Sequence, residues 1–404
     1  MSTENNSRAP RLRFPGFTGE WEEKKLGEIT NDIYQPQTIS KEQFTNTGYP
    51  VYGANGIIGF YDKYNHETDQ ILVTCRGASC GTINFSKGKC WITGNAMVVN
   101  LDKVISHYNK QFFYYLLENC DLNNIITGSG QPQIVRTPLL NLRILVPPTI
   151  AEQKKIAECL AEMDSLIDAQ SQNVDALKEE KKGLMQQLFP QDGETSPRRR
   201  FAGCSGDWTV NRLGNVCESM LVGFPFKGQD ITNDKSGHPI LRAYSIGTGC
   251  IMHGEGYDKY FPHDAKALEK YMVRSGDIVI AMDGSVGRNI AMVSDAEDGF
   301  LLIQRVARLR IKDYPIQLIY QQIISQRFKD FASAEKVGSI ISHISQKQIE
   351  SFPIYLPFSK DEQQKIADCL TALDDQITAE SAKLEALKVH KKGLMQQLFP
   401  QPAR

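Results

Sequence analysis

The chain has 404 residues and a formal net charge of −1, with 41% hydrophobic and 23% charged residues. This balance is typical of a globular protein and excludes a disordered or fibrous chain, and the length predicts two to three domains of roughly 150 residues each. No apolar run approaches the roughly 20 residues that span a bilayer and the polar start lacks a signal-peptide core, so we expect a cytoplasmic protein without a membrane segment.

Two stretches of the chain occur twice. Residues 10–21 are echoed at residues 197–208, an offset of 187, and residues 181–191 return letter for letter at 391–401, an offset of 210. The offsets differ by 23 residues, so the extra length of the second copy lies inside its body and not at its edges. The repeat predicts two similar halves that end in the same element.

The first body (residues 10–148) is rich in β-branched and aromatic residues punctuated by glycine. Residues 70–74 and 96–99 are expected to form short buried strands, and residues 76–81 a tight glycine loop between strands. Residues 111–117 are predicted to form a helix.

The second body (residues 197–358) follows the same plan loosely. A strand is expected at 277–281, leading into the glycine-containing loop 283–288, and a helix at 316–324. The two bodies are therefore predicted to be homologous mixed α/β domains of the α/β (α+β) class whose surfaces have diverged.

Long helices follow each body, at residues 149–190 and 359–400. Thr149 with Glu152, and Ser359 with Glu362, have capping-box spacing, in which the hydroxyl accepts from a free amide and the glutamate reaches back. Apolar residues then recur in alternating steps of four and three. This seam consists of Ile156, Leu160, Met163, Ile167, Val174 and Leu177 in the first helix, and Ile366, Leu370, Leu373, Ile377, Leu384 and Leu387 in the second.

A heptad seam of this length predicts that the two helices pair with each other as an antiparallel coiled coil, giving a pseudo-twofold internal repeat. The alternative is two surface helices that each pack on their own body. Polar residues interrupt the seam at Gln170 and Glu380 and at Lys181 and Lys391; they either fix the register or mark where the seam turns to solvent. Gly183 and Gly393 suggest close packing or a local break.

No catalytic or metal-binding pattern is present. Phosphate loops, nucleophile elbows, zinc-protease motifs and dinucleotide fingerprints are absent, and the seven histidines are isolated. Asp283 follows a strand as an acid catalyst could, but its counterpart in the first body is Arg76, so no shared catalytic role is expected. The nine cysteines are interpreted as reduced thiols, and Cys75, Cys80 and Cys90 lack zinc-site spacing.

The loops contain side chains suited to reading base edges, because arginine pairs with guanine and asparagine or glutamine with adenine. About a third of them are expected to touch DNA. The candidates in the first body are Gln35, Gln37, Asn55, Arg76, Asn95, Gln131, Gln133 and Arg136. Those in the second are Lys227, Arg242, Tyr244, Arg288, Asn289, Arg305, Arg308 and His343. With a net charge of −1, positive charge for DNA must be local or partly supplied by partner subunits.

The run Pro147-Pro148 followed by Glu152-Gln153 and Ile156, the heptad helix ending in residues 181–190, and the second copy of both together resemble the specificity subunit of type I restriction-modification systems. The resemblance covers residues 10–401. It implies two target recognition domains, each reading one half of a split asymmetric site in double-stranded DNA, and paired helices that act as spacer and dock.

The resemblance also implies partners and cofactors. Two methyltransferase subunits would bind S-adenosylmethionine and methylate adenine, and a restriction subunit, joined through the complex, would use ATP and Mg²⁺. No cofactor is expected on this chain, which would be a non-catalytic subunit. Two alternatives stay open: a coiled-coil scaffold whose bodies bind proteins, favoured by the near-neutral charge, and an enzyme with an unrecognised site.

Overall fold

The computed structural model describes residues 8–128, 130–191, 193–284, 287–334 and 343–400. The chain divides into two compact units, unit 1 from Met1–Asn173 with Glu380–Arg404 and unit 2 from Val174–Ala379. Each unit therefore combines one body with the beginning of one long helix and the end of the other. The domain limits expected at residues 148 and 358 remain predictions. The two units meet within the long helices and not where these helices start, so their boundaries do not test those limits.

Unit 1 is a mixed α/β structure. Its elements are β1 (Glu22–Lys25), α1 (Leu26–Ile29), β2 (Ile33–Tyr34), β3 (Tyr49–Gly53), β4 (Gly56–Tyr61), β5 (Ile71–Thr74), β6 (Ile83–Phe85), β7 (Trp91–Ile92), β8 (Ala96–Val99), α2 (Lys110–Glu118), α3 (Arg136–Leu140), β9 (Arg143–Val146), the start of α4 (Ile150–Leu188) and the end of α9 (Lys360–Leu398). The main sheet is antiparallel in the order β2-β8-β5-β6, and a smaller sheet has the order β4-β3-β7.

The centre of the main sheet confirms the strands predicted from the sequence. All four residues of β5 and all four of β8 are buried, and their register pairs Ile71 with Val99 and Thr74 with Ala96. The predicted helix near residue 111 is α2, which covers the sheet with Phe112 and Phe113 fully buried. The expected glycine loop connects β5 to β6.

Unit 2 repeats this plan. Its elements are the end of α4, β10 (Trp208–Arg212), α5 (Leu213–Val216), β11 (Cys217–Val222), β12 (His238–Leu241), β13 (Lys259–Phe261), β14 (Ile278–Ala281), β15 (Ile290–Met292), β16 (Leu301–Leu302), β17 (Val306–Ile311), α6 (Ile316–Ile323), α7 (Gln326–Ala334), α8 (Gln346–Ser351), β18 (Pro353–Pro357) and the start of α9 (Lys360–Leu398). Its main sheet, β11-β17-β14-β15, corresponds strand for strand to the main sheet of unit 1. The prediction of two homologous bodies is confirmed.

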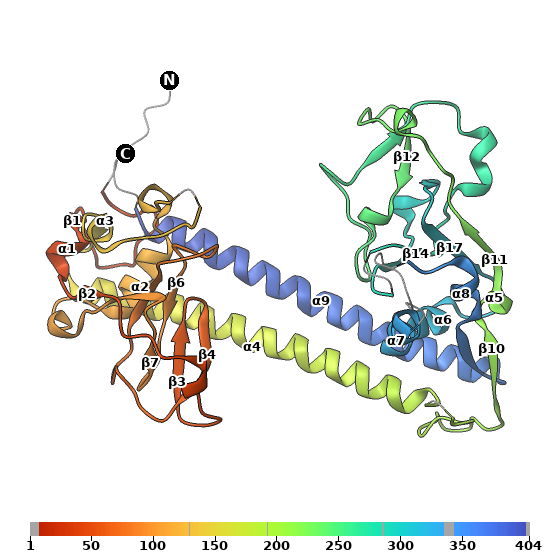
Figure 1. The fold of residues 1–404 in the computed structure, drawn as a ribbon, viewed down its shortest axis with the longest axis horizontal. Coiled ribbons are helices and arrows are strands. Elements are labelled where there is room, and N and C mark those ends of the chain that lie inside the picture. The colour runs from red at the N-terminus through yellow and green to blue at the C-terminus, as the bar shows by residue number, and fades with distance from the viewer. Residues whose placement is uncertain (1–7, 129, 192, 285–286, 335–342, 401–404) are drawn as a thin grey trace. The chain divides into compact units, whose positions relative to one another are not determined.

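Both long helices are continuous over 39 residues each (Figure 1, α4 yellow-green and α9 blue). All of the predicted seam residues are buried or half-buried. Within unit 1, Asp164 contacts Lys391, and Gln170, which lies later in α4, contacts Glu380, which lies earlier in α9. The two helices therefore run in opposite directions. This is the predicted antiparallel pairing.

Two local predictions for these helices are wrong. Gly183 and Gly393 neither break the helix nor pack closely, since a Cβ built at either residue would meet no atom within 4 Å. The capping boxes are only half formed. Thr149 and Ser359 accept from the amides of Glu152 and Glu362, at 3.3 and 3.4 Å, but the glutamates bind arginines and do not reach back.

The repeated stretch at the end of each helix completes the core of a unit. In unit 1, the ring of Phe399 lies 6.4 Å from that of Trp21 and 5.6 Å from that of Phe112. In unit 2, the ring of Phe189 lies 6.0 Å from that of Trp208. Burial of these aromatic side chains explains why the apolar residues of the stretch are the same in both copies.

Candidate nucleic-acid interface

The duplication lets each loop of the first body be compared with its counterpart in the second. In unit 1, the loop after β5 forms an antiparallel bridge between Arg76 and Gln133. In unit 2, the loop after β14 forms the same bridge between Asp283 and His343. Arg76 and Asp283 therefore occupy equivalent backbone positions, as do Gln133 and His343.

A third pair of equivalent residues lies beside each bridge. The amide of Cys75 donates to the carbonyl of Asn95 at 3.2 Å, and the amide of Met282 donates to the carbonyl of Arg305 at 2.9 Å. Asn95 and Arg305 immediately precede the matching strands β8 and β17. We call the two sets the equivalent trios: Arg76, Asn95 and Gln133 in the first body, and Asp283, Arg305 and His343 in the second.

Arg76 and Gln133 of the first trio border a pocket of about 420 Å³ at the carboxyl end of β5. The pocket is lined by Ile33, Tyr34, Gln35, Arg76, Met97, Gln133, Ile134, Val135 and Arg136. Four of the candidates from the sequence thus meet at one place. The exposed side chains of Arg76 and Gln133 have no hydrogen-bond partner among the described residues, so their donors and acceptors are open to a ligand.

The two other candidates at this pocket are occupied by internal contacts. Arg136 donates through Nε to the carbonyl of Ile33 and through Nη2 to that of Asn31, both at 2.7 Å. The amide nitrogen of Gln35 donates to the Cys75 sulfur at 2.9 Å and to the Gly94 carbonyl at 3.3 Å. Both side chains shape the wall of the pocket.

The second trio is held together by a carboxylate. Asp283 Oδ1 lies 2.6 Å from His343 Nδ1, and Asp283 Oδ2 accepts from Arg305 Nη1 at 2.7 Å. Burial tends to raise the pKa of Asp283, but the hydrogen bonds from His343 and Arg305 outweigh it and hold the pKa below its usual value. The carboxylate is therefore charged at neutral pH and orients two basic side chains.

The remaining candidates are placed as follows. Gln37, Asn55, Gln131, Lys227, Tyr244 and Arg288 are exposed, while Arg242 and Asn289 are half-buried. The ring of Tyr244 stacks on that of Tyr257 at 5.3 Å, and Asn55 lies at the turn between β3 and β4. None of these residues belongs to the equivalent trios.

Arg308 is a buried residue of β17, only 5% exposed. Its Nη1 donates to the carbonyls of Lys270 and Met272 at 3.1 and 3.0 Å, and burial lowers its pKa. In this conformation its guanidinium is directed into the second body, so we leave Arg308 out of the proposed interface.

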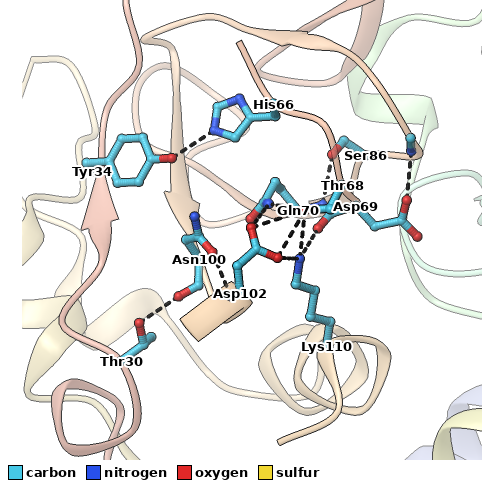
Figure 2. Close-up of polar contacts among 11 residues, drawn as sticks. Thr30, Tyr34, His66, Thr68, Asp69, Gln70, Ser86, Asn100, Asp102 and Lys110 are labelled. Carbon is cyan, nitrogen blue, oxygen red and sulfur yellow. Dashed lines mark hydrogen bonds and ion pairs between the residues drawn. The ribbon is translucent and has the colours of Figure 1, made fainter. Parts of the chain in front are cut away.

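Unit 1 also contains a polar cluster that the sequence did not indicate, because its members are far apart in the chain. Figure 2 shows the Asp102 carboxylate accepting from Thr68 at 3.0 Å and from Gln70 at 2.9 Å, with Lys110 beside it. Burial raises the pKa of Asp102, but the contacts from Lys110 and Gln70 outweigh it and lower the pKa overall. These contacts tie the start of β5 to α2.

The polar residues in the helix seam have partners. Lys181 Nζ lies 2.6 Å from Asp374 Oδ1 in unit 2, and Lys391 Nζ lies 2.7 Å from Asp164 Oδ1 in unit 1. These two pairs are related by the 210-residue repeat. Because each lysine meets an acid on the other helix, the pairs favour the register interpretation over a turn to solvent.

Each body is also tied to its helix by a matched ion pair. Arg13 binds Glu152 through two bonds of 2.8 and 2.9 Å, and Arg200 binds Glu362 through two bonds of 2.8 and 2.6 Å. Both glutamates are buried. A bidentate arginine binds a carboxylate more strongly than a single backbone amide does, which explains why the capping boxes are incomplete.

The described residues contain no cluster of three or more His, Cys, Asp or Glu side chains able to hold a metal ion. None of the helices in the described part of the chain is long and apolar enough to cross a membrane.

Comparisons with known proteins agree with this architecture. The model of the type I restriction modification DNA specificity domain matches residues 18–179 and 205–389, one match for each half. The MjaVIII specificity subunit of a type I restriction enzyme from Methanocaldococcus jannaschii is 27% identical, over 98% of this chain and 95% of that protein. The EcoprrI specificity subunit from Escherichia coli is 29% identical over 41% of each chain.

The fold is also found among solved structures. The type I restriction-modification S subunit from M. genitalium has a TM-score of 0.65 at 17% identity, covering 98% of this chain and 100% of that one. Because the family model matches most of the chain and does so twice, the protein belongs to the family of type I restriction-modification DNA specificity subunits.

Proposed function

We propose that this specificity subunit recognises a bipartite, asymmetric DNA site, with one half-site read by each body. The observation that carries the proposal is the contrast between the two copies. The stretch that ends each long helix and closes a core is identical in the two copies, whereas the equivalent trios carry different side chains on matching backbone positions. Two readers with different donors and acceptors suit two different half-sites.

The first trio supplies groups that match base edges. Arg76 presents the paired donors that fit guanine, and Asn95 and Gln133 can each donate and accept as adenine requires. The backbone bridge between Arg76 and Gln133 holds two of these side chains together at the pocket. A rigid backbone beneath exposed polar side chains reduces the entropy lost on binding DNA.

We further propose that the helices act as a spacer and that their repeated ends dock two copies of one methyltransferase subunit, through which the restriction subunit joins. Lys182, Gln186 and Gln187 are exposed, as are their copies Lys392, Gln396 and Gln397. Internal packing gives no reason for exposed residues to be identical in both copies. Binding the same partner twice does.

The glycines of the repeated stretch support the same dock. A glycine inside a helix costs about 1 kcal/mol relative to alanine, and neither Gly183 nor Gly393 has an internal neighbour that requires it. A missing side chain lets the backbone of another molecule approach closely. S-adenosylmethionine, ATP and Mg²⁺ would then bind the partner subunits, and the complex would act in the cytoplasm on double-stranded DNA.

The test is selection of DNA from a random duplex library by the chain assembled with its methyltransferase partner, at several salt concentrations. The expected result is enrichment of two short motifs separated by a fixed gap. Enrichment of one contiguous motif, or of none, would contradict the proposal, and retention of no DNA at any salt would favour the protein-binding scaffold.

A further inference from the structure

The backbone of Arg305 is in an unusual conformation. Within the described residues, Arg305 alone among the non-glycine residues has a positive φ, of 66°. This region is disfavoured for L-residues because Cβ crowds the following carbonyl, and glycine or asparagine tolerates it better. Arginine therefore occupies a position at which its backbone is strained.

Backbone hydrogen bonds on both sides hold this conformation. The amide of Gln304 donates to the carbonyl of Phe224 at 2.8 Å, and the carbonyl of Arg305 accepts from Met282 at 2.9 Å. Strained residues that the surroundings fix in this way occur preferentially at functional sites. The side chain of Arg305, and not its backbone, is therefore the reason for arginine at this position.

The side chain is exposed and oriented. Arg305 is 66% exposed, while the Asp283 carboxylate that binds its Nη1 is only 22% exposed. The Nε and Nη2 groups of Arg305 have no partner among the described residues. Two adjacent guanidinium donors match the O6 and N7 acceptors of guanine in the major groove.

Asp283 itself is unsuited to contact DNA, because its negative charge would be repelled by the phosphates. Exposed ion pairs also contribute little net stability, so the Asp283–Arg305 pair does not explain the strain. Fixing the plane of the guanidinium is the role that remains. It reduces the rotamer freedom that Arg305 would otherwise lose on binding.

We propose that Arg305 reads a guanine in the half-site of the second body, and that Asp283 is the positioning residue that orients it. This inference rests on the proposed function. In the first body Asn95 takes the place of Arg305 and Arg76 takes the place of Asp283. The first trio therefore has no carboxylate to orient a base-reading side chain. The same backbone positions thus present different base-reading groups.

The experiment compares motifs selected from a random duplex library by the complete complex with its methyltransferase partner. The variants are Arg305→Ala, Arg305→Gly and Asp283→Asn, with Lys312→Ala as control. Lys312 is also cationic and exposed, and follows the opposite end of β17 from Arg305. The control therefore measures the loss of one positive charge without loss of the proposed reader.

Both Arg305 variants are expected to lose the preference for guanine at one position of one half-site, by at least about tenfold, as for loss of one paired base contact. Asp283→Asn should weaken the preference at that same position by a smaller factor. The other half-site and the gap should not change, and Lys312→Ala should keep the whole motif. Arg305→Gly should melt at the wild-type temperature or above, because glycine relieves the strain.

Two results would overturn the inference while leaving the proposed function intact. One is an unchanged motif in both Arg305 variants. The other is a lower melting temperature of Arg305→Gly with an even loss of affinity for all sites, which would show a structural role. If the wild-type complex selects no bipartite motif, the proposed function itself fails.

Discussion

Replacing Gly183 and Gly393 by alanine should separate the stability of the chain from its assembly. A Cβ at either position meets no atom within 4 Å, so the substitution introduces no clash. Alanine is favoured over glycine inside a helix by about 1 kcal/mol, and the double variant should therefore raise the free energy of unfolding by about 2 kcal/mol. Denaturant unfolding of the isolated chain measures this gain.

The same variant should bind the methyltransferase partner more weakly, because the added methyl groups stand where we propose that the partner approaches. Titration of partner into labelled chain measures the affinity. Asn173→Ala is the matched control, since Asn173 is exposed on α4 outside the repeated stretch and its substitution also favours the helix. A more stable double variant that binds its partner with unchanged affinity would refute the role of the glycines in docking.

Three further predictions concern the helices and the first body. Glu152→Gln should lower the free energy of unfolding by roughly 3 kcal/mol, because it leaves the largely buried Arg13 without its charged partner. The control Glu23→Gln alters only ion pairs to the exposed Arg8 and Arg143 and should change the free energy of unfolding by less than about 1 kcal/mol. Equal effects of the two substitutions in denaturant unfolding would contradict this prediction. The pKa of Asp102 is lowered in the folded chain, so its stabilising contribution is present above the unfolded pKa of about 4 and is lost as the pH falls through the folded pKa. The difference in unfolding free energy between wild type and Asp102→Asn should therefore shrink below about pH 4, and a constant difference down to pH 2 would show that the carboxylate charge is not responsible. Deleting one heptad from each helix, residues 168–174 and 378–384, should shorten the gap between selected half-sites by about three base pairs. Seven helical residues span about 10 Å, whereas one base pair spans about 3.4 Å. A change in the bases selected within a half-site would argue against the helices as a simple spacer.

The regular elements could be predicted because they depend on local pattern. The buried strands β5 and β14 are short apolar runs, and the seam of α4 and α9 follows from strict heptad spacing. The internal repeat also predicted that both bodies share one fold. These features need no knowledge of which distant residues meet.

Contacts between distant segments were not accessible in this way. The partners of Lys181 and Lys391 are Asp374 and Asp164, which could be paired only once the relative register of the helices was known. Asp164 and Asp374 are themselves related by the repeat, and this signal could have suggested both pairs together. The competition of Arg13 for Glu152 likewise crosses 139 residues.

The candidate site shows the same division. Residue type selected Arg76, Asn95, Gln133, Arg305 and His343 from the sequence, but only the backbone bridges group them into equivalent trios. Asp283 was considered only as a possible acid catalyst, because its role depends on two side chains brought in from other segments. Arg308 was selected as an arginine, although its strand is buried.

The division of the site between the bodies can be measured most directly by mapping methylated adenines in the genome of a host that carries the variant Arg76→Ala, Asn95→Ala and Gln133→Ala. These substitutions change the first trio and leave the second body and both helices intact. The account predicts that one half of the methylated motif becomes degenerate while the other half and the gap stay as in wild type. A change in both halves, or an unchanged motif, would contradict it.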